Sequence, residues 1–495
     1  MSKRMKAITN TTMKLNDCRQ AWHFDRAHDI WCLEDICYTP HAKTPEFQRM
    51  NIYVPAEYMK EGGVLFPNGR HGRFTAETAP VVFFNNAAGY MQMPAGRPGD
   101  DRDTSAQYLE RGMVFVSCGC RGRESVDSEG ILCGKSPWTL VDFKTAIRFL
   151  RHNAASLPGR MDRLISVGWS AGGAMSALLG VTGNNSLYNT YLEENGAFMD
   201  ETDDVYASQI YCPIVDLEHA DLAYEWQFHA DKVSEGGPGG AGGKLTPFED
   251  ALSKRLSDAY IRHFNGLELK HPDSGEILQL GPDGRSGSGY EYLMQQLENS
   301  ASEYFRRLAA DTLTGQDQTP DDSEWLSWDG KHAHISDLDT YLLSHRRRMK
   351  HCTSFDTLNN DSGENQEFGT SEHDFMHFCT AIAPEMDALR EEFPDEVTRY
   401  FDAFAAADGD SNLNQRKYLI NPMNFIGTDE PDSGTVHYRI RVGACDADTA
   451  FTVSMTLALR LSEVGKNTDY ALVWDRPHCE ADYPGECCDW IETIV

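Results

Sequence analysis

The chain has 495 residues, with 45 lysines and arginines against 76 aspartates and glutamates, which gives a formal net charge of −31. Nucleic acids and anionic membranes both need a cationic surface on the protein, so we expect neither as a partner. A hydrophobic fraction of 40% with 11% aromatic residues is typical of a globular protein and excludes a disordered one.

Two features of the sequence predict a cytoplasmic protein. Charged side chains interrupt residues 1–22, which contain no apolar run, so we expect no secretory signal there. The 13 cysteines are scattered, without the Cys-x-x-Cys spacing of a zinc ribbon or a thioredoxin-like site. Such cysteines are typical of reduced thiols that pack in a core. No stretch reaches the roughly 20 apolar residues that span a bilayer.

Short apolar runs alternate with a helical pattern in the first part of the chain. Residues 81–84 (Val-Val-Phe-Phe) and 113–116 (Met-Val-Phe-Val) predict two buried strands. Residues 139–151 carry apolar side chains at the spacing of one helix face. Residues 164–167 and 208–217 predict two more strands. This alternation indicates an α/β fold, with a mostly parallel sheet and helices on both faces.

The composition changes at about residue 219. Residues 219–430 are rich in charge and helix formers, and they predict an inserted, mainly helical lid domain. Helical periodicity is clear at 252–264 and at 290–308. The glycine-rich residues 235–244 predict a flexible loop, and residues 315–324 are acidic.

The alternation of strands and helices resumes after the insertion. Three further elements are predicted there: a strand at 437–442, an amphipathic helix at 449–464 and a strand at 470–474. The predicted organisation is therefore a core formed by residues 1–218 and 431–495, with the lid domain of residues 219–430 inserted between its two parts.

Residues 168–173 (Gly-Trp-Ser-Ala-Gly-Gly) form a G-x-S-x-G motif between a predicted strand and a predicted helix. The serine of such a motif lies on a strained turn, and the small residues around it let neighbouring backbone approach. The start of the following helix supplies free N–H groups and a positive potential. The motif therefore predicts a nucleophilic Ser170, and the alternative is a chance glycine-rich turn.

A serine nucleophile needs a histidine base that is held by an acid. In this fold the three residues follow in the order serine, acid, histidine, the last two on loops after late strands. His478 is the only histidine beyond the last predicted strand, and Asp446 follows the strand before it. Two alternatives stay open: Asp448 as the acid, and a structural role for His478.

We expect the oxyanion hole to use the N–H of Ala171, the residue after the nucleophile. The second N–H should come from the loop at 85–90, which follows an early strand. Gly89 is the preferred donor because glycine lets backbone approach a substrate, and Ala88 is the alternative. The HGGG motif of lipases is absent from this loop.

Further motifs occur together with the G-x-S-x-G sequence. They are Asn-x-x-x-Gly-Tyr at 85–90, Asp-x-Asp-Thr at 446–449, Trp-Asp-x-Pro-His at 474–478, and, in the insertion, Phe355-Asp356 and Glu364-Asn365-x-x-Phe368-Gly369. Over most of its length the chain thereby resembles the bacterial subtype B tannases. Trp169 in the motif and Ala87-Ala88 in the early loop depart from the expected pattern.

The resemblance implies hydrolysis of the ester bond between gallic acid and an alcohol. It implies an α/β-hydrolase core with a large helical lid, a Ser-His-Asp triad, and neither a metal nor another cofactor. It places the galloyl-binding groups on Lys350, Glu364 and Asp448. Carboxylates accept hydrogen bonds from phenolic hydroxyls, and an ammonium donates to a phenol oxygen. Without the resemblance, Lys350 and Glu364 would be interpreted as part of a solvated charged face.

Two other functions stay open. The same triad could cleave feruloyl, protocatechuoyl or other aryl esters, which differ from gallate in their ring hydroxyls. A catalytically silent hydrolase fold could instead act as a binding module, although candidates for all three triad roles are present and argue against it.

Three smaller features of the sequence have some of the residues that a site needs. Cys445 and Cys479 flank the proposed acid and base, so we hypothesise that they are neighbours able to form a bridge under oxidation. His373 and His377 have the spacing of a metal-binding pair but lack a third ligand. Residues 408–414 begin like a calcium loop but lack its glycine and its terminal glutamate. We interpret the histidine pair as structural and the loop as a turn.

Overall fold

The computed structural model describes residues 22–101, 103–237, 240–310, 312, 325–428, 430–479 and 481–495. Its central sheet is built from these strands: β1 His23–Asp25, β2 Ile30–Cys37, β3 Arg49–Pro55, β8 Pro80–Asn85, β9 Val114–Cys118, β10 Arg160–Trp169, β11 Ala207–Tyr211, β16 His437–Gly443 and β17 Asn467–Val473. Two small hairpins lie between β3 and β8: β4 Met59–Lys60 with β5 Val64–Leu65, and β6 Arg70–His71 with β7 Phe74–Thr75.

The strands of the nine-stranded sheet lie in the order β1-β2-β3-β9-β8-β10-β11-β16-β17. From β9 to β17 in this order every neighbouring pair is parallel, whereas β1, β2, β3 and β9 pair antiparallel. Strands β8, β9 and β11 are buried along their whole length, as parallel strands are when both faces of the sheet are covered. The predicted α/β fold is confirmed.

The helices outside the insertion are α1 Ser105–Leu109, α2 Trp138–His152, α3 Ala171–Val181, α4 Asn189–Glu194, α13 Phe451–Glu463 and α14 Glu486–Ile494. Helix α3 consists of small and apolar residues on all sides and is buried throughout. It packs on β10 and β11, while α13 packs on β16 and β17. These two contacts support the sheet next to the strand ends that carry the proposed site.

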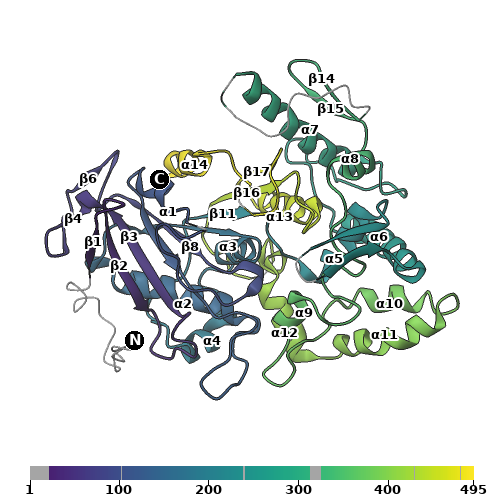
Figure 1. The fold of residues 1–495 in the computed structure, drawn as a ribbon, viewed down its shortest axis with the longest axis horizontal. Coiled ribbons are helices and arrows are strands. Elements are labelled where there is room, and N and C mark those ends of the chain that lie inside the picture. Colours follow the sequence, from purple (N-terminus) through teal and green to yellow (C-terminus); the bar gives the residue numbers. More distant parts are fainter. Residues whose placement is uncertain are drawn as a thin grey trace.

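The chain leaves the sheet after β11 and returns with β16. The insertion contains α5 Leu217–Phe228, β12 Val233–Gly237, β13 Gly240–Lys244, α6 Pro247–Gly266, α7 Ser288–Ala309, β14 Leu326–Trp328, β15 Ala333–Ile335, α8 Leu338–His345, α9 Gly363–Glu367, α10 Ile382–Asp387, α11 Pro394–Asp408 and α12 Ser411–Ile420. Figure 1 shows this teal and green part to one side of the sheet. The structure thus has the predicted helical lid, and the boundaries at 218 and 430 stay a prediction.

Two predicted elements differ from the structure. The strand predicted at 208–217 ends at Tyr211, because Cys212 and Asp216 have positive φ angles of 41° and 50°, which an extended strand does not allow. Of the glycine-rich residues 235–244, predicted as a flexible loop, the described residues 235–237 and 240–244 lie in the paired strands β12 and β13. The acidic residues 315–324 lie outside the described residues.

The hairpin β12–β13 has a definite partner. Its first strand donates two backbone hydrogen bonds to residues 348–349, from Glu235 N–H to the Arg348 carbonyl at 2.8 Å and from Gly236 N–H to the Met349 carbonyl at 3.1 Å. The hairpin therefore supports the segment that contains Lys350. Of the helices in the described ranges, none is both long and apolar enough to cross a bilayer.

Candidate active site

Ser170 occupies a strained turn between β10 and α3. Its backbone has φ 58° and ψ −121°, a conformation that residues other than glycine rarely adopt. The Ser170 N–H donates to the Tyr211 carbonyl at 3.0 Å, and the Ser170 carbonyl accepts from the N–H groups of Ala174 and Ile214. The end of β11 and the loop after it therefore hold the turn in place.

The glycines of the motif are required by close backbone contacts. A Cβ atom on Gly168 would lie 2.2 Å from the Gly172 carbonyl oxygen and 2.5 Å from Asn85 Oδ1. A Cβ atom on Gly173 would lie 2.4 Å from the Tyr211 carbonyl oxygen. Larger residues would push the turn away from both neighbouring strands.

His478 and Asp446 form a close pair at the same edge of the sheet as Ser170. His478 Nδ1 lies 2.8 Å from Asp446 Oδ2; the Asp446 side chain is fully buried and the His478 side chain is 17% exposed. Strands β10, β11, β16 and β17 are consecutive in the sheet. Since carboxyl ends of parallel strands meet at one edge, Ser170 after β10, Asp446 after β16 and His478 after β17 all lie there.

The two loops that carry this pair pack backbone against backbone. A Cβ atom on Gly443 would lie 2.2 Å from the carbonyl oxygens of Arg476 and Pro477. The Cys445 N–H donates to the Arg476 carbonyl at 2.8 Å. The separation of Asp446 and His478 is therefore set by the main chain as well as by their own hydrogen bond.

The surroundings favour a charged acid and a basic imidazole. Burial alone would raise the pKa of the Asp446 carboxyl, but His478 and hydrogen bonds from the Asp448 N–H and the Cys212 thiol lower it. Burial would lower the pKa of His478, but the Asp446 carboxylate and its hydrogen bond outweigh burial and raise it. A carboxylate whose pKa is lowered, beside a histidine whose pKa is raised, is the arrangement that a general base requires. The sequence gives no local signal for Cys212, which follows β11.

The two candidate oxyanion donors lie on elements in contact. Ala171 is the first residue of α3, so its N–H has no partner within the helix. Gly89 lies in a 3-10 turn, Ala88–Tyr90, that packs against α3. Its φ is 58°, and a Cβ atom there would meet only Met91 Cγ, at 4.0 Å. The choice between Gly89 and Ala88 stays a prediction.

Two of the galloyl-binding candidates lie close to His478. Asp448 Oδ2 is 4.0 Å from His478 Nδ1, and the Asp448 side chain is 19% exposed. The Lys350 ammonium lies 3.7 Å from the centre of the Phe355 ring. Its positive charge opposes part of the rise in the pKa of His478, so the two groups are within electrostatic reach of each other. The structure thus brings Lys350 and Asp448 to the proposed triad.

Glu364 lies beside the loop that contains the candidate oxyanion donor Gly89. It lies on α9, which packs against the 3-10 turn that contains Gly89. The side chain of Arg123 links these elements, since its Nε donates to the Gly89 carbonyl at 2.9 Å and its Nη1 donates to the side chain of Gln366 on α9.

Two buried carboxyls outside the predicted triad and galloyl-binding residues hold the segment with Lys350 and Glu364. Asp221 on α5 accepts hydrogen bonds from the backbone N–H groups of residues 354–356, and burial raises its pKa to about 7. Asp356 lies 2.6 Å from His377 Nδ1 and accepts from the Asn365 side chain at 2.7 Å. The motifs Phe355-Asp356 and Glu364-Asn365 are the only sequence signal for this network.

The minor candidates have local explanations. His377 is buried against Asp356, whereas His373 is exposed. Asp410, in the predicted calcium-like turn, accepts hydrogen bonds from the first N–H groups of α12 and caps that helix. Cys445 Sγ lies 3.4 Å from His345 Nε2, and a bridge between Cys445 and Cys479 stays a prediction.

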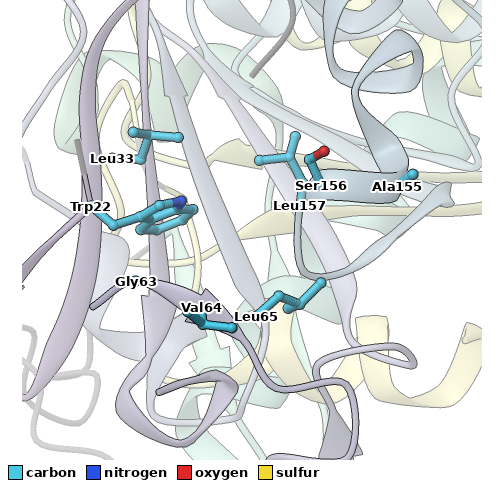
Figure 2. A pocket seen from close by; sticks show the side chains of 8 residues that line it. All are labelled: Trp22, Leu33, Gly63, Val64, Leu65, Ala155, Ser156 and Leu157. Atoms are coloured by element: carbon cyan, nitrogen blue, oxygen red, sulfur yellow. The ribbon is translucent and has the colours of Figure 1, made fainter. Parts of the chain in front are cut away.

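A pocket of about 150 Å³ lies near the start of strand β10, at the end opposite to Ser170. Figure 2 shows its lining: Trp22, Leu33, Gly63, Val64, Leu65, Ala155, Ser156 and Leu157. Leu157 precedes β10 and Ser170 follows it, so the whole length of that strand separates this pocket from the nucleophile. We therefore do not assign the pocket to the site.

Comparisons with known proteins agree with this fold. The family described as BD-FAE, a family of α/β-hydrolases, matches residues 75–227. A search of curated protein sequences found no match.

Solved structures match nearly the whole chain. The tannin acyl hydrolase from Lactobacillus plantarum is similar with 32% identity and a TM-score of 0.80, over 94% of both chains. The tannase of Fusobacterium nucleatum is similar with 32% identity and a TM-score of 0.78, over 94% of this chain and 95% of that one. A tannin acyl hydrolase in complex with ethyl gallate has 32% identity and a TM-score of 0.77, over 94% and 93%. The chain therefore belongs to the tannase family and is a carboxylic ester hydrolase with the α/β-hydrolase fold.

Proposed function

We propose that this chain hydrolyses galloyl esters, such as tannins and alkyl gallates, through a Ser-His-Asp triad. The observation that carries the proposal is the 2.8 Å contact of His478 with the buried Asp446, at the sheet edge where Ser170 lies on a strained turn. The complexes of similar tannin acyl hydrolases with ethyl gallate and with 3,4-dihydroxybenzoate support the choice of acyl group.

The reaction proceeds in two steps. In the first, Ser170 Oγ attacks the ester carbonyl while His478 Nε2 takes its proton, and Asp446 keeps the imidazole oriented. The N–H groups of Ala171 and Gly89 stabilise the oxyanion of the tetrahedral intermediate. His478 then returns the proton to the leaving alcohol, which leaves a galloyl-enzyme at Ser170. In the second step, His478 activates a water that releases gallate.

Three side chains recognise the galloyl ring. The carboxylates of Glu364 and Asp448 accept hydrogen bonds from ring hydroxyls, and the Lys350 ammonium donates to a phenol oxygen. The ammonium is already oriented by the face of Phe355. A ring without hydroxyls would leave these groups unpaired in the closed site, so the site discriminates against it.

Hydrolysis of methyl gallate by the wild type and by Ser170→Ala tests the proposal. Methyl protocatechuate, methyl ferulate and p-nitrophenyl acetate serve as comparison substrates. We expect gallate turnover that is lost in Ser170→Ala, and little turnover of ferulate. Turnover of p-nitrophenyl acetate alone would retain the triad and reject the galloyl pocket. A faster reaction with protocatechuate than with gallate would reassign the acyl group.

A further inference from the structure

One phenol oxygen in the insertion connects the two groups of residues on which the proposed function depends. Tyr224 lies on α5 and is fully buried. Its hydroxyl donates a hydrogen bond to the Ala447 carbonyl at 3.0 Å. The same oxygen accepts hydrogen bonds from the backbone N–H groups of Met349 at 3.1 Å and Lys350 at 3.0 Å. All of its hydrogen-bonding capacity is used by these two segments.

The segments joined in this way carry the proposed catalytic acid and two galloyl-binding groups. Ala447 lies between Asp446 and Asp448, and Lys350 is itself one of the bonded residues. The Lys350 ammonium also lies 6.0 Å from the centre of the Tyr224 ring, in addition to its contact with Phe355. Burial raises the pKa of Tyr224, so its hydroxyl keeps the proton that it donates to Ala447.

We propose that Tyr224 is a positioning residue for substrate recognition: its hydroxyl fixes Lys350 relative to Asp446 and Asp448, so that the galloyl hydroxyls meet all their partners at once. This inference rests on the proposed function, because it assumes that Lys350 binds the galloyl ring. Tyr224 itself touches no reacting atom in this scheme. It acts by fixing the position of the Lys350 backbone.

Loss of the Tyr224 hydroxyl should change the position of Lys350 more than it reduces the stability of the fold. Tyr224→Phe keeps the ring, which packs on Phe228 and Phe355 with centroid distances of 4.6 Å and 6.1 Å. Residue 348 remains held by the buried ion pair of Arg348 with Glu225 and by the hairpin β12–β13. The backbone N–H of Lys350, by contrast, loses its hydrogen bond to the Tyr224 hydroxyl, and with it the link through that oxygen to the Ala447 carbonyl.

The test compares Tyr224→Phe with Tyr341→Phe. Tyr341 is a matched control, because its buried hydroxyl donates to the carbonyl of Ala444, on the other side of Asp446 in the same loop. For each variant we would measure kcat/KM with methyl gallate and with p-nitrophenyl acetate, which reports the triad without the galloyl ring. The ratio of interest is kcat/KM with methyl gallate divided by kcat/KM with p-nitrophenyl acetate. We expect Tyr224→Phe to lower this ratio by about tenfold to a hundredfold, as a misplaced binding group does. Tyr341→Phe should lower both values in parallel.

Two further variants separate failure of this inference from failure of the proposed function. If Lys350→Ala leaves the ratio at the wild-type value, Lys350 does not bind the ring, so this inference and the galloyl-binding role of Lys350 are wrong, whereas failure of the proposed function itself would appear as absence of methyl gallate turnover in the wild type. If Lys350→Ala lowers the ratio but Tyr224→Phe does not, or if Tyr341→Phe lowers it equally, only the positioning role is overturned. The double variant should have the ratio of Lys350→Ala alone, since Tyr224 acts through Lys350, and additive losses would contradict this. Thermal unfolding of each variant checks that it is folded.

Discussion

Replacing Asp446 by asparagine changes the proposed acid with little change in shape. In the wild type one carboxylate oxygen, Oδ2, faces His478 Nδ1 at 2.8 Å, and the other, Oδ1, accepts from the Asp448 N–H at 2.8 Å. An asparagine has a single acceptor oxygen. If that oxygen keeps the Asp448 N–H, the amide NH₂ faces His478 and donates to Nδ1. The imidazole proton then resides on Nε2, which can no longer accept the proton of Ser170.

The expected loss follows from this inverted tautomer and from the lost charge. A wrongly oriented imidazole with its proton on Nε2 costs a triad hydrolase about 10⁴-fold in kcat. At about 1.4 kcal/mol for each factor of ten, the loss corresponds to about 5 kcal/mol of transition-state stabilisation. The buried Asp446 site has no solvent to replace the missing carboxylate, because its side chain is 0% exposed.

The assay is steady-state hydrolysis of p-nitrophenyl acetate and methyl gallate, with the melting temperature of each variant as a check on folding. Asp448→Asn is the matched control, since Asp448 Oδ2 lies 4.0 Å from His478 Nδ1, beyond hydrogen-bonding distance. It should raise KM for methyl gallate and leave kcat for p-nitrophenyl acetate within a few-fold. Either of two results would refute the assignment of the acid. One is a folded Asp446→Asn enzyme that keeps a tenth of the wild-type kcat for p-nitrophenyl acetate. The other is a folded Asp448→Asn enzyme that loses most of that kcat.

Three other predictions concern His478, Gly443 and Glu367. His478 accepts a proton only when its ring is neutral. Because the pKa of His478 is raised, the acidic limb of kcat/KM should have its midpoint above pH 6.5, and a midpoint below that value would contradict the role of Asp446. Gly443→Ala should abolish activity or folding, because its Cβ atom would lie 2.2 Å from two carbonyl oxygens of the His478 loop, whereas Gly409→Ala, with no atom within 4 Å, should match the wild type in activity and melting temperature. Glu367 is buried, and burial raises its pKa from 4.5 to about 8. Between these two pH values the folded chain keeps the proton on Glu367, whereas the unfolded chain has released it. The free energy of unfolding therefore falls as the pH rises from 4.5 to 8. Glu367→Gln should therefore raise the melting temperature more at pH 8 than at pH 5, and an equal effect at both would count against the shifted pKa.

The features that could be predicted from the sequence are those with a local physical cause. The parallel strands are buried on both faces and therefore appear as short apolar runs. The turn at Ser170 needs small neighbours, which the motif supplies. The order of strands and loops then leaves few residues that can reach the serine, so that Asp446 and His478 could be selected as the close pair that the structure contains.

The features that could not be predicted depend on irregular or distant contacts. Strand β2 carries Glu34 and Asp35 in its middle, at a shift of register where Asp35 has φ 58°, and this hides the alternation of a strand. The sequence analysis therefore does not predict β2 as a strand. Cys212 comes to Asp446 only because β11 pairs with β16, and Tyr224 meets a carbonyl 223 positions further along the chain. No window of sequence contains such a contact.

The place of the insertion has a consequence for synthesis of the protein. Strand β11 leaves the ribosome long before β16, its neighbour in the sheet, because the whole insertion is translated between them. Until β16 arrives, β11 offers an unpaired row of N–H and C=O groups and apolar side chains, which is a template for pairing with another nascent molecule. We therefore expect chains truncated before residue 437 to aggregate, and the complete protein to depend most on chaperones while its last two strands are still being made.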